Sequence, residues 1–206
     1  MKKLFKFFVL TAVAACFAFV VPNETKTKEI NIVIDAGHGG KDFGAKYNDI
    51  IEKEITNEIA QKINELNKNS NIVIHFTRFN DNFVDLNERV NTINSLKPDL
   101  LISLHVNSQS IGTERSGMEF FVYDKNAVAT KSAQYAESLA QQFKEANYNV
   151  GEVKTASMYL LKNSESPAII FEMGYLTNQY DRAYLTNENN KEKIARTILD
   201  FVASIE

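Results

Sequence analysis

Apolar residues recur along this chain in two alternating patterns, one typical of strands and one typical of helices. Runs of consecutive apolar residues, as at 100–104, are expected of strands buried on both faces of a sheet. Residues 52–66 instead carry isoleucine and leucine at spacings of three and four, which predicts a helix with one buried face. Together the patterns predict strands at 30–35, 71–76, 100–104, 118–123 and 168–171, and helices at 52–66, 84–96, 127–146 and 189–205.

Strands separated by helices predict an α/β fold, because the connecting helices cover the faces of the sheet. We expect a single three-layer domain with a mostly parallel, mixed and twisted sheet of about six strands, and with helices on both faces. Residues 157–161 are expected to form a short strand or a turn, and 149–154 a loop. The sequence shows no internal repeat and no sign of a second domain.

The first residues differ in kind from the rest. Residues 1–6 are basic and 7–21 are apolar, and this apolar run is shorter than a membrane-spanning helix needs. The pattern predicts a signal peptide or N-terminal anchor at 1–21, a polar linker at 22–29 and the working domain at 30–206. We therefore expect an exported protein of the periplasm or cell envelope that meets a membrane only through this segment.

Cys16 leaves the processing of this segment open. Val-Ala-Ala-Cys at 13–16 resembles a lipobox, which would make Cys16 a lipid-anchored N-terminus. The apolar residues 17–21 argue against this, since lipoproteins usually turn polar after the cysteine. The alternatives are cleavage near Ala18 or an uncleaved anchor.

Composition narrows the chemistry. The 206 residues carry 23 lysines and arginines against 26 acidic residues, so no positive excess favours nucleic acid as a partner. Without residues 1–21, which hold three lysines and no acid, the net charge is −6. A single cysteine excludes an internal disulfide and a cysteine-based zinc site. A metal site must therefore use histidine, aspartate or glutamate, and there are only three histidines.

Polar residues follow three of the predicted strands, and sites in α/β sheets form at the carboxyl ends of strands. These residues lie at 35–40, 105–108 and 172–174, and they include two of the three histidines, whereas His75 lies inside a strand and is expected to be structural. Two histidines and a carboxylate form a known catalytic zinc set. Spacing alone does not choose the third ligand among Asp35, Asp42, Glu52, Glu54 and Glu172.

Several segments together resemble one known family. They are Ile-Asp-Ala-Gly-His-Gly-Gly-Lys-Asp-Phe-Gly-Ala at 34–45, Glu-Lys-Glu-Ile-Thr-Asn at 52–57, Thr-Arg at 77–78, Leu-Asn-Glu-Arg-Val at 86–90, Ile-Ser-Leu-His-Val-Asn at 102–107, and Pro-Ala-Ile-Ile-Phe-Glu-Met-Gly-Tyr-Leu-Thr-Asn at 167–178. In this order the chain is similar to the zinc-dependent N-acetylmuramoyl-L-alanine amidases of bacterial cell-wall metabolism. The fold expected is of the phosphorylase/hydrolase-like kind.

The resemblance implies a site and a reaction. It implies one zinc ion bound by His38, Glu52 and His105, with Glu172 as the catalytic carboxylate. Glu52 rather than Glu54 corresponds to the family's ligand, which directly precedes a lysine. The reaction implied is hydrolysis of the amide between the lactyl group of N-acetylmuramic acid and the L-alanine of the stem peptide. One departure is Ala36, where the family often has proline.

Three further residues are weaker candidates for the site. Asp35 either orients a metal ligand or only ends a strand, and Arg89 either pairs with a carboxylate or touches substrate. Asn107 follows a predicted ligand and is a candidate to line the cleft. Peptidoglycan is the expected partner of a monomer. No activator is expected, because predicted elements already fill the interval between His105 and Glu172.

Two alternative functions belong to other classes. One is a peptidoglycan-binding protein that has lost catalysis, although no member of the implied metal set is missing. The other is a zinc peptidase of a different α/β fold. Carboxypeptidase-like sites place glutamate three residues after the first histidine, and that position here is Lys41.

Overall fold

A six-stranded sheet forms the centre of the computed structural model, which describes residues 29–205. Its strand order is β4-β1-β5-β8-β6-β7; β4, β1, β5 and β8 are parallel, and β6 pairs antiparallel with β8 and parallel with β7. The bounds are β1 Ile30–Ala36, β4 Ile72–Phe76, β5 Leu100–Asn107, β6 Met118–Val122, β7 Val150–Thr155 and β8 Ala168–Tyr175. A small separate hairpin consists of β2 (Lys46–Tyr47) and β3 (Ile50–Ile51).

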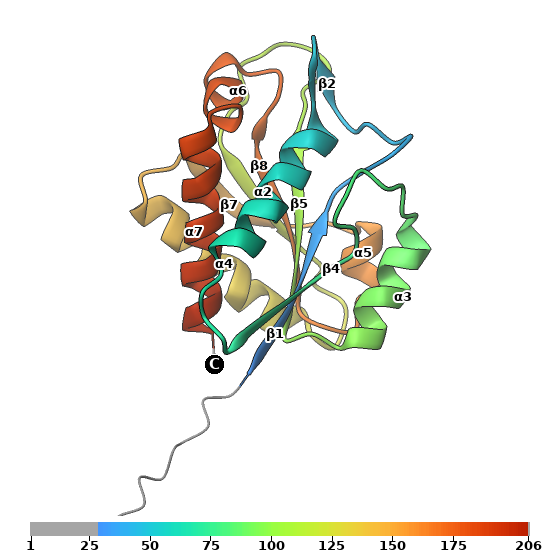
Figure 1. Ribbon diagram of the computed structural model, residues 1–206. Coiled ribbons are helices and arrows are strands. Elements are labelled where there is room, and N and C mark those ends of the chain that lie inside the picture. The colour runs from blue at the N-terminus through green and yellow to red at the C-terminus, as the bar shows by residue number, and fades with distance from the viewer. Residues whose placement is uncertain (1–28, 206) are drawn as a thin grey trace, which may run out of the picture.

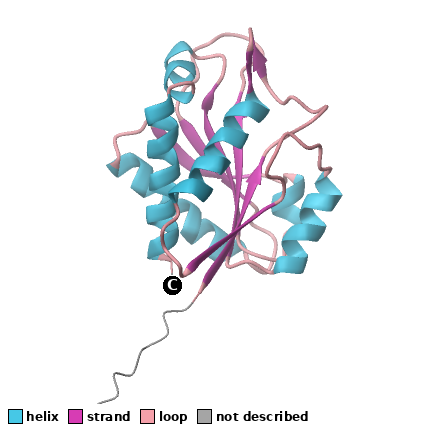
Figure 2. Ribbon diagram, viewed as in Figure 1, coloured by secondary structure: helices cyan, strands magenta, loops and turns pink. Residues whose placement is uncertain are grey.

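Helices cover both faces of this sheet (Figures 1 and 2). One face packs against α2 (Glu52–Leu66), α4 (Ala129–Glu145) and α7 (Glu188–Ser204). The other face packs against α3 (Leu86–Leu96) and the short α5 (Tyr159–Asn163). A further helix, α6 (Gln179–Leu185), contacts β8 and α7. The predicted three-layer α/β domain with a mixed sheet is therefore confirmed.

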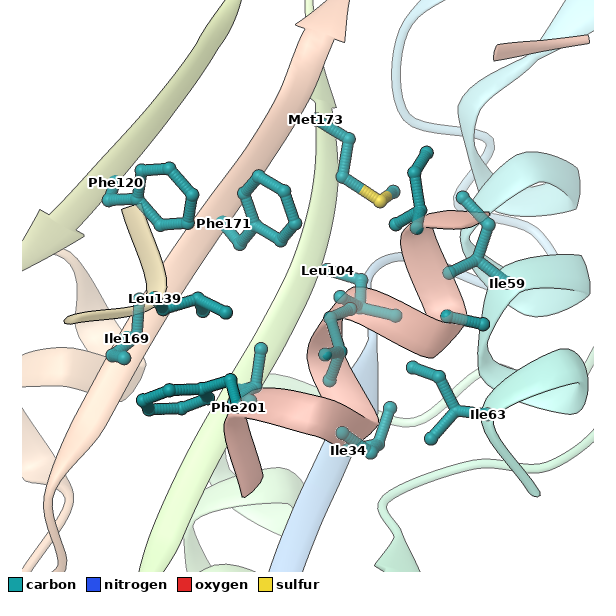
Figure 3. Close-up of a cluster of buried hydrophobic side chains, with 14 of the residues drawn as sticks. Ile34, Ile59, Ile63, Leu104, Phe120, Leu139, Ile169, Phe171, Met173 and Phe201 are labelled. Carbon is teal, nitrogen blue, oxygen red and sulfur yellow. The ribbon is translucent and has the colours of Figure 1, made fainter. Parts of the chain in front are cut away.

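Alternate side chains of the central strands supply the two cores. In β1, Ile32 and Ile34 face the core under α2 and α7, whereas Val33 belongs to the core under α3. Figure 3 shows Ile59 and Ile63 of α2 and Phe201 of α7 meeting residues of the sheet. All of these side chains are fully buried, and each burial stabilises the fold by about 1.5–3 kcal/mol. This rigid sheet holds the strands whose carboxyl ends carry the polar residues.

Local predictions at the second half of the chain were less accurate. Residues 157–161, predicted as a strand or turn, contribute instead to α5, and 149–154, predicted as a loop, form most of the edge strand β7. In β7 only Val150 and Val153 are half-buried, so it lacks the alternation that would have marked it. Helix α6 was not predicted; the side chain of Asn178 caps it by accepting hydrogen bonds from Tyr180 N and Asp181 N.

The N-terminal predictions concern residues that the structure leaves undescribed. The predicted signal or anchor at 1–21, Cys16 with it, and residues 22–28 of the predicted linker lie outside the described residues. Within 29–205 no helix is long and apolar enough to cross a membrane.

Candidate active site

Three predicted ligands come together at the carboxyl end of the parallel strands. His38 lies in the loop after β1, Glu52 is the first residue of α2, and His105 lies in β5. Nε2 of His38 and Nδ1 of His105 are 3.1 Å and 3.0 Å from the same atom, Oε1 of Glu52. The ligand atoms of the three residues all lie within 4.8 Å of one another. Two imidazole nitrogens and a carboxylate oxygen therefore converge on one point.

The surrounding backbone fixes the carboxylate of Glu52. This residue is buried, its Oε2 accepts a hydrogen bond from Ala45 N at 2.7 Å, and its Oε1 accepts one from Val106 N at 2.9 Å. Burial alone would raise its pKa, but the hydrogen bonds from His105 and His38 outweigh burial and hold the pKa of Glu52 well below its usual value. Glu54 is exposed and does not belong to this cluster.

His38 is held in an uncommon backbone conformation, with φ at 60°. Its Nδ1 contacts Oδ2 of Asp42 at 2.9 Å, which turns Nε2 toward Glu52. Burial lowers the pKa of His38, but the hydrogen bonds with Glu52 and Asp42 prevail and raise it to about 9. Asp42, one of the carboxylates considered as a third ligand, therefore orients a histidine instead, as carboxylates behind metal-binding histidines do.

Gly44 allows the close packing of this cluster. Its φ is +67°, a conformation that glycine adopts without strain, and a Cβ there would lie 2.5 Å from Oε2 of Glu52 and 2.6 Å from Cδ2 of His38. Gly37 is similarly confined, since a Cβ would lie 2.5 Å from Cε1 of His105. Gly37 and Gly44 thus make room for the side chains of His38, Glu52 and His105.

Glu172 lies beside this cluster, paired with His105 in the register of β8 and β5. Both residues lie inside their strands, because β5 and β8 run several residues further than predicted. Oε2 of Glu172 is buried and has no hydrogen-bond partner among the residues described. Burial raises the pKa of Glu172 to about 7, against the opposing charge of His105. A carboxyl with this pKa can both accept and return a proton near neutral pH.

Two buried arginines hold the loop that carries His38. Arg89 on α3 donates to Oδ1 of Asp35 at 2.6 Å, to Ala36 O at 2.8 Å and to His38 O at 2.6 Å. Arg78 donates from the other side to Ala36 O and to the Gly37 carbonyl, both at 2.8 Å. The candidates Asp35 and Arg89 are therefore paired with each other. Sequence reasoning assigned no role to Arg78, although Thr-Arg at 77–78 is one of the segments that resemble the family.

Asp35 is enclosed by donors. In addition to Arg89, Ser103 Oγ donates to its Oδ2 at 2.6 Å, and the hydroxyl of Thr77 donates to its Oδ1. Burial would raise its pKa, but the charge of Arg89 and these hydrogen bonds hold the pKa of Asp35 below its usual value. The residue is ionised and fully satisfied at neutral pH.

The third weaker candidate, Asn107, contacts a polar group formed by Glu119 and Lys154. Glu119 lies on β6, across β8 from the strand that carries His105. Nδ2 of Asn107 donates to Oε2 of Glu119 at 3.2 Å, and Lys154 Nζ lies 2.5 Å from Oε1 of Glu119. Glu119 pairs with Glu172 in the register of β6 and β8. Sequence reasoning missed both Glu119 and Lys154. The strand of Glu119 was predicted, but its pairing with Glu172 depends on the register of β6 and β8, and Lys154 belongs to the strand that was predicted as a loop.

A cavity of about 630 Å³ opens beside the cluster, on the face of the sheet covered by α3 and α5. His38, His105 and Glu172 form one part of its lining. Asp35, Asp42, Arg89 and Ser103 line it nearby, and the segments 83–87 and 158–160 supply most of its apolar lining. His75 lies apart from this site and contacts the side chain of Asn31, as the structural interpretation predicted. A substrate bound in this cavity would lie between the apolar segments and the side chains of His38, His105 and Glu172.

The family can be stated from comparison with known proteins. A sequence profile described as N-acetylmuramoyl-L-alanine amidase matches residues 32–204. The chain belongs to this family. It is 34% identical over 188 residues to the N-acetylmuramoyl-L-alanine amidase LytC of Bacillus subtilis, a match that covers 89% of this chain and 37% of LytC. The chain thus spans little more than a third of that relative. The predicted family is confirmed.

Solved amidase structures share the fold. The N-acetylmuramoyl-L-alanine amidase of Clostridium difficile 630 superposes with a TM-score of 0.81 at 27% identity, over 86% of this chain and 97% of that one. The CwlD amidase of Clostridioides difficile, solved in complex with the GerS lipoprotein, superposes with a TM-score of 0.77 at 26% identity, over 86% of this chain and all of that one.

Proposed function

We propose that this chain is a zinc-dependent peptidoglycan hydrolase that cleaves the amide between N-acetylmuramic acid and the L-alanine of the stem peptide. The observation that carries the proposal is the convergence of His38, Glu52 and His105 within 4.8 Å, with the unpaired carboxyl of Glu172 beside them. Membership of the amidase family supplies the class of reaction and of substrate.

The donor set fits zinc. Catalytic zinc sites commonly use three protein ligands, and two histidines with one glutamate are such a set. Here Nε2 of His38, Nδ1 of His105 and the carboxylate of Glu52 would hold the ion. When bound, zinc supplies a Lewis acid that polarises a carbonyl and lowers the pKa of water. Asp42 and the backbone donors at Ala45 and Val106 would keep these ligands in place.

The chain's own residues would carry the proton. The carboxylate of Glu172 takes a proton from the attacking water as the new C–O bond forms at the scissile carbonyl. It then returns this proton to the leaving nitrogen as the C–N bond breaks, so that an amine and a carboxylic acid result. A pKa of about 7 suits both halves of this transfer, because neither protonation state is strongly favoured. The buried position beside β5 keeps the carboxyl away from competing partners.

Zinc content and muropeptide hydrolysis, measured on the same preparations, test the proposal. Glu172→Gln should keep its zinc and lose activity by about 10²–10⁴-fold, the usual contribution of acid–base catalysis. His38→Ala and His105→Ala should lose both. Glu52→Gln should lose zinc, and Glu54→Gln is its matched control, since it lies on the same helix and is exposed. A metal-loaded wild-type chain that binds muropeptides without cleaving them would favour the inactive binding protein. Cleavage of a different bond would favour the peptidase.

We further propose that the chain acts in the cell envelope as a monomer without an activator. Within the described residues, the interval between β5 and β8 holds β6, α4, β7 and α5, and no additional helix covers the site. The complex with the GerS lipoprotein is a property of CwlD. The direct alternative to this proposal is that the chain also works with a partner protein. Hydrolysis by the purified chain alone supports the proposal, whereas hydrolysis only after addition of envelope extract would refute it. Mass spectrometry of the mature N-terminus would decide the fate of Cys16.

A further inference from the structure

A second cavity lies away from the metal-ligand cluster. It has a volume of about 330 Å³ and is lined by residues from the loop 146–149 after α4, the start of β6, α6 and the first two turns of α7. It shares no lining residue with the larger cavity beside Glu172. Its size is that of a small ligand site. Nothing in the proposed hydrolysis uses it.

Aromatic side chains form one part of this cavity. Tyr180 is 75% exposed, whereas Tyr148 and Tyr184 are partly buried with their ring centroids 5.9 Å apart. The hydroxyl of Tyr184 donates to Met173 O, but that of Tyr148 is buried and has no hydrogen-bond partner among the residues described. Buried hydroxyls are rarely left unpaired in folded proteins. The cavity thus offers one open aromatic face, that of Tyr180.

Amide side chains and one cation form the remaining rim. Asn147, Asn149 and Asn190 bring carboxamides, each able to donate and to accept hydrogen bonds. Lys193 is exposed and makes no ion pair with the described part of the chain. The acid in the cavity, Asp181, is already engaged, because its Oδ2 accepts hydrogen bonds from Gly117 N and Tyr175 N at 2.8 Å.

We infer that this cavity binds a glycan of N-acetylated sugars, with Lys193 receiving a sugar-borne carboxylate. A sugar ring has an apolar C–H face that suits the Tyr180 ring, and hydroxyl and acetamido groups that suit the three carboxamides. The choice of carboxylate rests on the proposed function, because cleavage of the lactyl amide leaves a free carboxylate on each N-acetylmuramic acid. The cavity therefore fits the glycan strand from which the stem peptides have been removed.

Binding can be tested without any catalysis. We would titrate the purified, isotope-labelled full chain with two peptide-free tetrasaccharides and record NMR spectra. One alternates N-acetylglucosamine with N-acetylmuramic acid, and the other contains only N-acetylglucosamine. Both should shift the signals of residues 146–149, 180–184 and 190–193, the acidic one at lower concentration. Signals of the metal site are read separately, since a glycan also belongs to the proposed substrate.

Three variants decide the interpretation. Tyr180→Ala should lower the affinity of the cavity for both tetrasaccharides by about tenfold, since it removes the exposed ring. Lys193→Ala should remove the preference for the acidic tetrasaccharide and leave the neutral one unchanged. Lys68→Ala, an exposed lysine on the loop before β4, is the matched control and should bind as the wild type does. Unshifted signals around the cavity, or Tyr180→Ala binding like the wild type, would overturn the inference.

Failure of this inference is distinguishable from failure of the proposed function. If the cavity signals shift but the chain does not hydrolyse muropeptides, the glycan site is supported and the amidase function is refuted. If the chain hydrolyses muropeptides but the cavity signals do not shift, the amidase function is supported and the glycan site is refuted. Tyr180→Ala and Lys193→Ala should also leave turnover of a small soluble muropeptide unchanged, because neither residue lines the cavity beside Glu172.

Discussion

Replacement of Arg89 by alanine tests how the structure holds its active-site loop. Arg89 and Asp35 are 3% and 1% exposed, and their charged atoms are 2.6 Å apart. The substitution leaves the carboxylate of Asp35 buried without its counter-charge, which typically costs about 3–5 kcal/mol. It also removes the donors to Ala36 O and His38 O. Against a usual total stability of about 5–15 kcal/mol, this loss is large.

Urea unfolding in the presence of a chelator measures this loss without a contribution from bound metal. We expect a free energy of unfolding lower by about 3–5 kcal/mol and a Tm lower by about 6–20 °C. Arg196→Ala is the matched control, because Arg196 pairs with Glu192 on the exposed surface of α7. Exposed pairs contribute about 0–1 kcal/mol, so this variant should be nearly as stable as the wild type.

The pH dependence of the same measurement gives the sign of the effect. In the wild type the pKa of Asp35 is lowered, so its stabilising contribution is present above the unfolded pKa of about 3.9 and is lost as the pH falls through the folded pKa. Without Arg89, burial should raise that pKa, and the variant should lose stability as pH rises above about 4. The difference between the two proteins should therefore grow from pH 4 to pH 7. A loss below about 1 kcal/mol, or one that is independent of pH, would refute the reasoning.

Three other predictions concern single side chains. Gly44→Ala should weaken zinc binding by about 10–100-fold in a chelator competition, because its Cβ would displace Glu52 and His38. Gly151→Ala is the control and should bind zinc as the wild type does, because a Cβ there would lie 3.4 Å from the nearest atom. Tyr148→Phe should raise the free energy of unfolding by up to about 1 kcal/mol in urea titrations, because it removes an unpaired buried hydroxyl, whereas Tyr159→Phe, which loses its bond to Asn87, should not. Lys154→Met should leave the charge of Glu119 uncompensated beside Glu172 and so raise the pKa of Glu172 further. The acidic limb of the pH profile of kcat should then move to higher pH. Lys68→Met is the control and should leave this limb in place; an unmoved limb in Lys154→Met would contradict the prediction.

The central elements were predictable because their sequence pattern and their burial agree. The buried runs of β5 and β8, and the stripe of Ile55, Ile59 and Ile63 on α2, mark elements whose apolar sides are covered. Edge strand β7 and the short helices α5 and α6 have few buried residues, so their conformation depends on neighbours far along the chain. Chain-local patterns carry little information about such elements.

The site divides in the same way. The resemblance named His38, Glu52, His105 and Glu172, and the fold brings all four to one place. The roles of the groups around them could not be inferred: Asp42 was considered only as a third ligand, Arg78 only as part of a family segment, and Glu119 not at all. Their positions follow only from the register of β5, β8 and β6 and from the turn at His38.

The four groups also come from distant parts of the chain. His38 follows the first strand, whereas Glu172 lies in β8, the last strand of the sheet. Between them β5 must be inserted next to both β1 and β8 before His105 faces Glu52. No fragment that lacks either end can assemble the constellation, and contacts this remote in sequence form slowly during folding. Hydrolytic capacity is therefore a property of the finished fold alone. A chain whose fold is still incomplete cannot carry out the proposed hydrolysis.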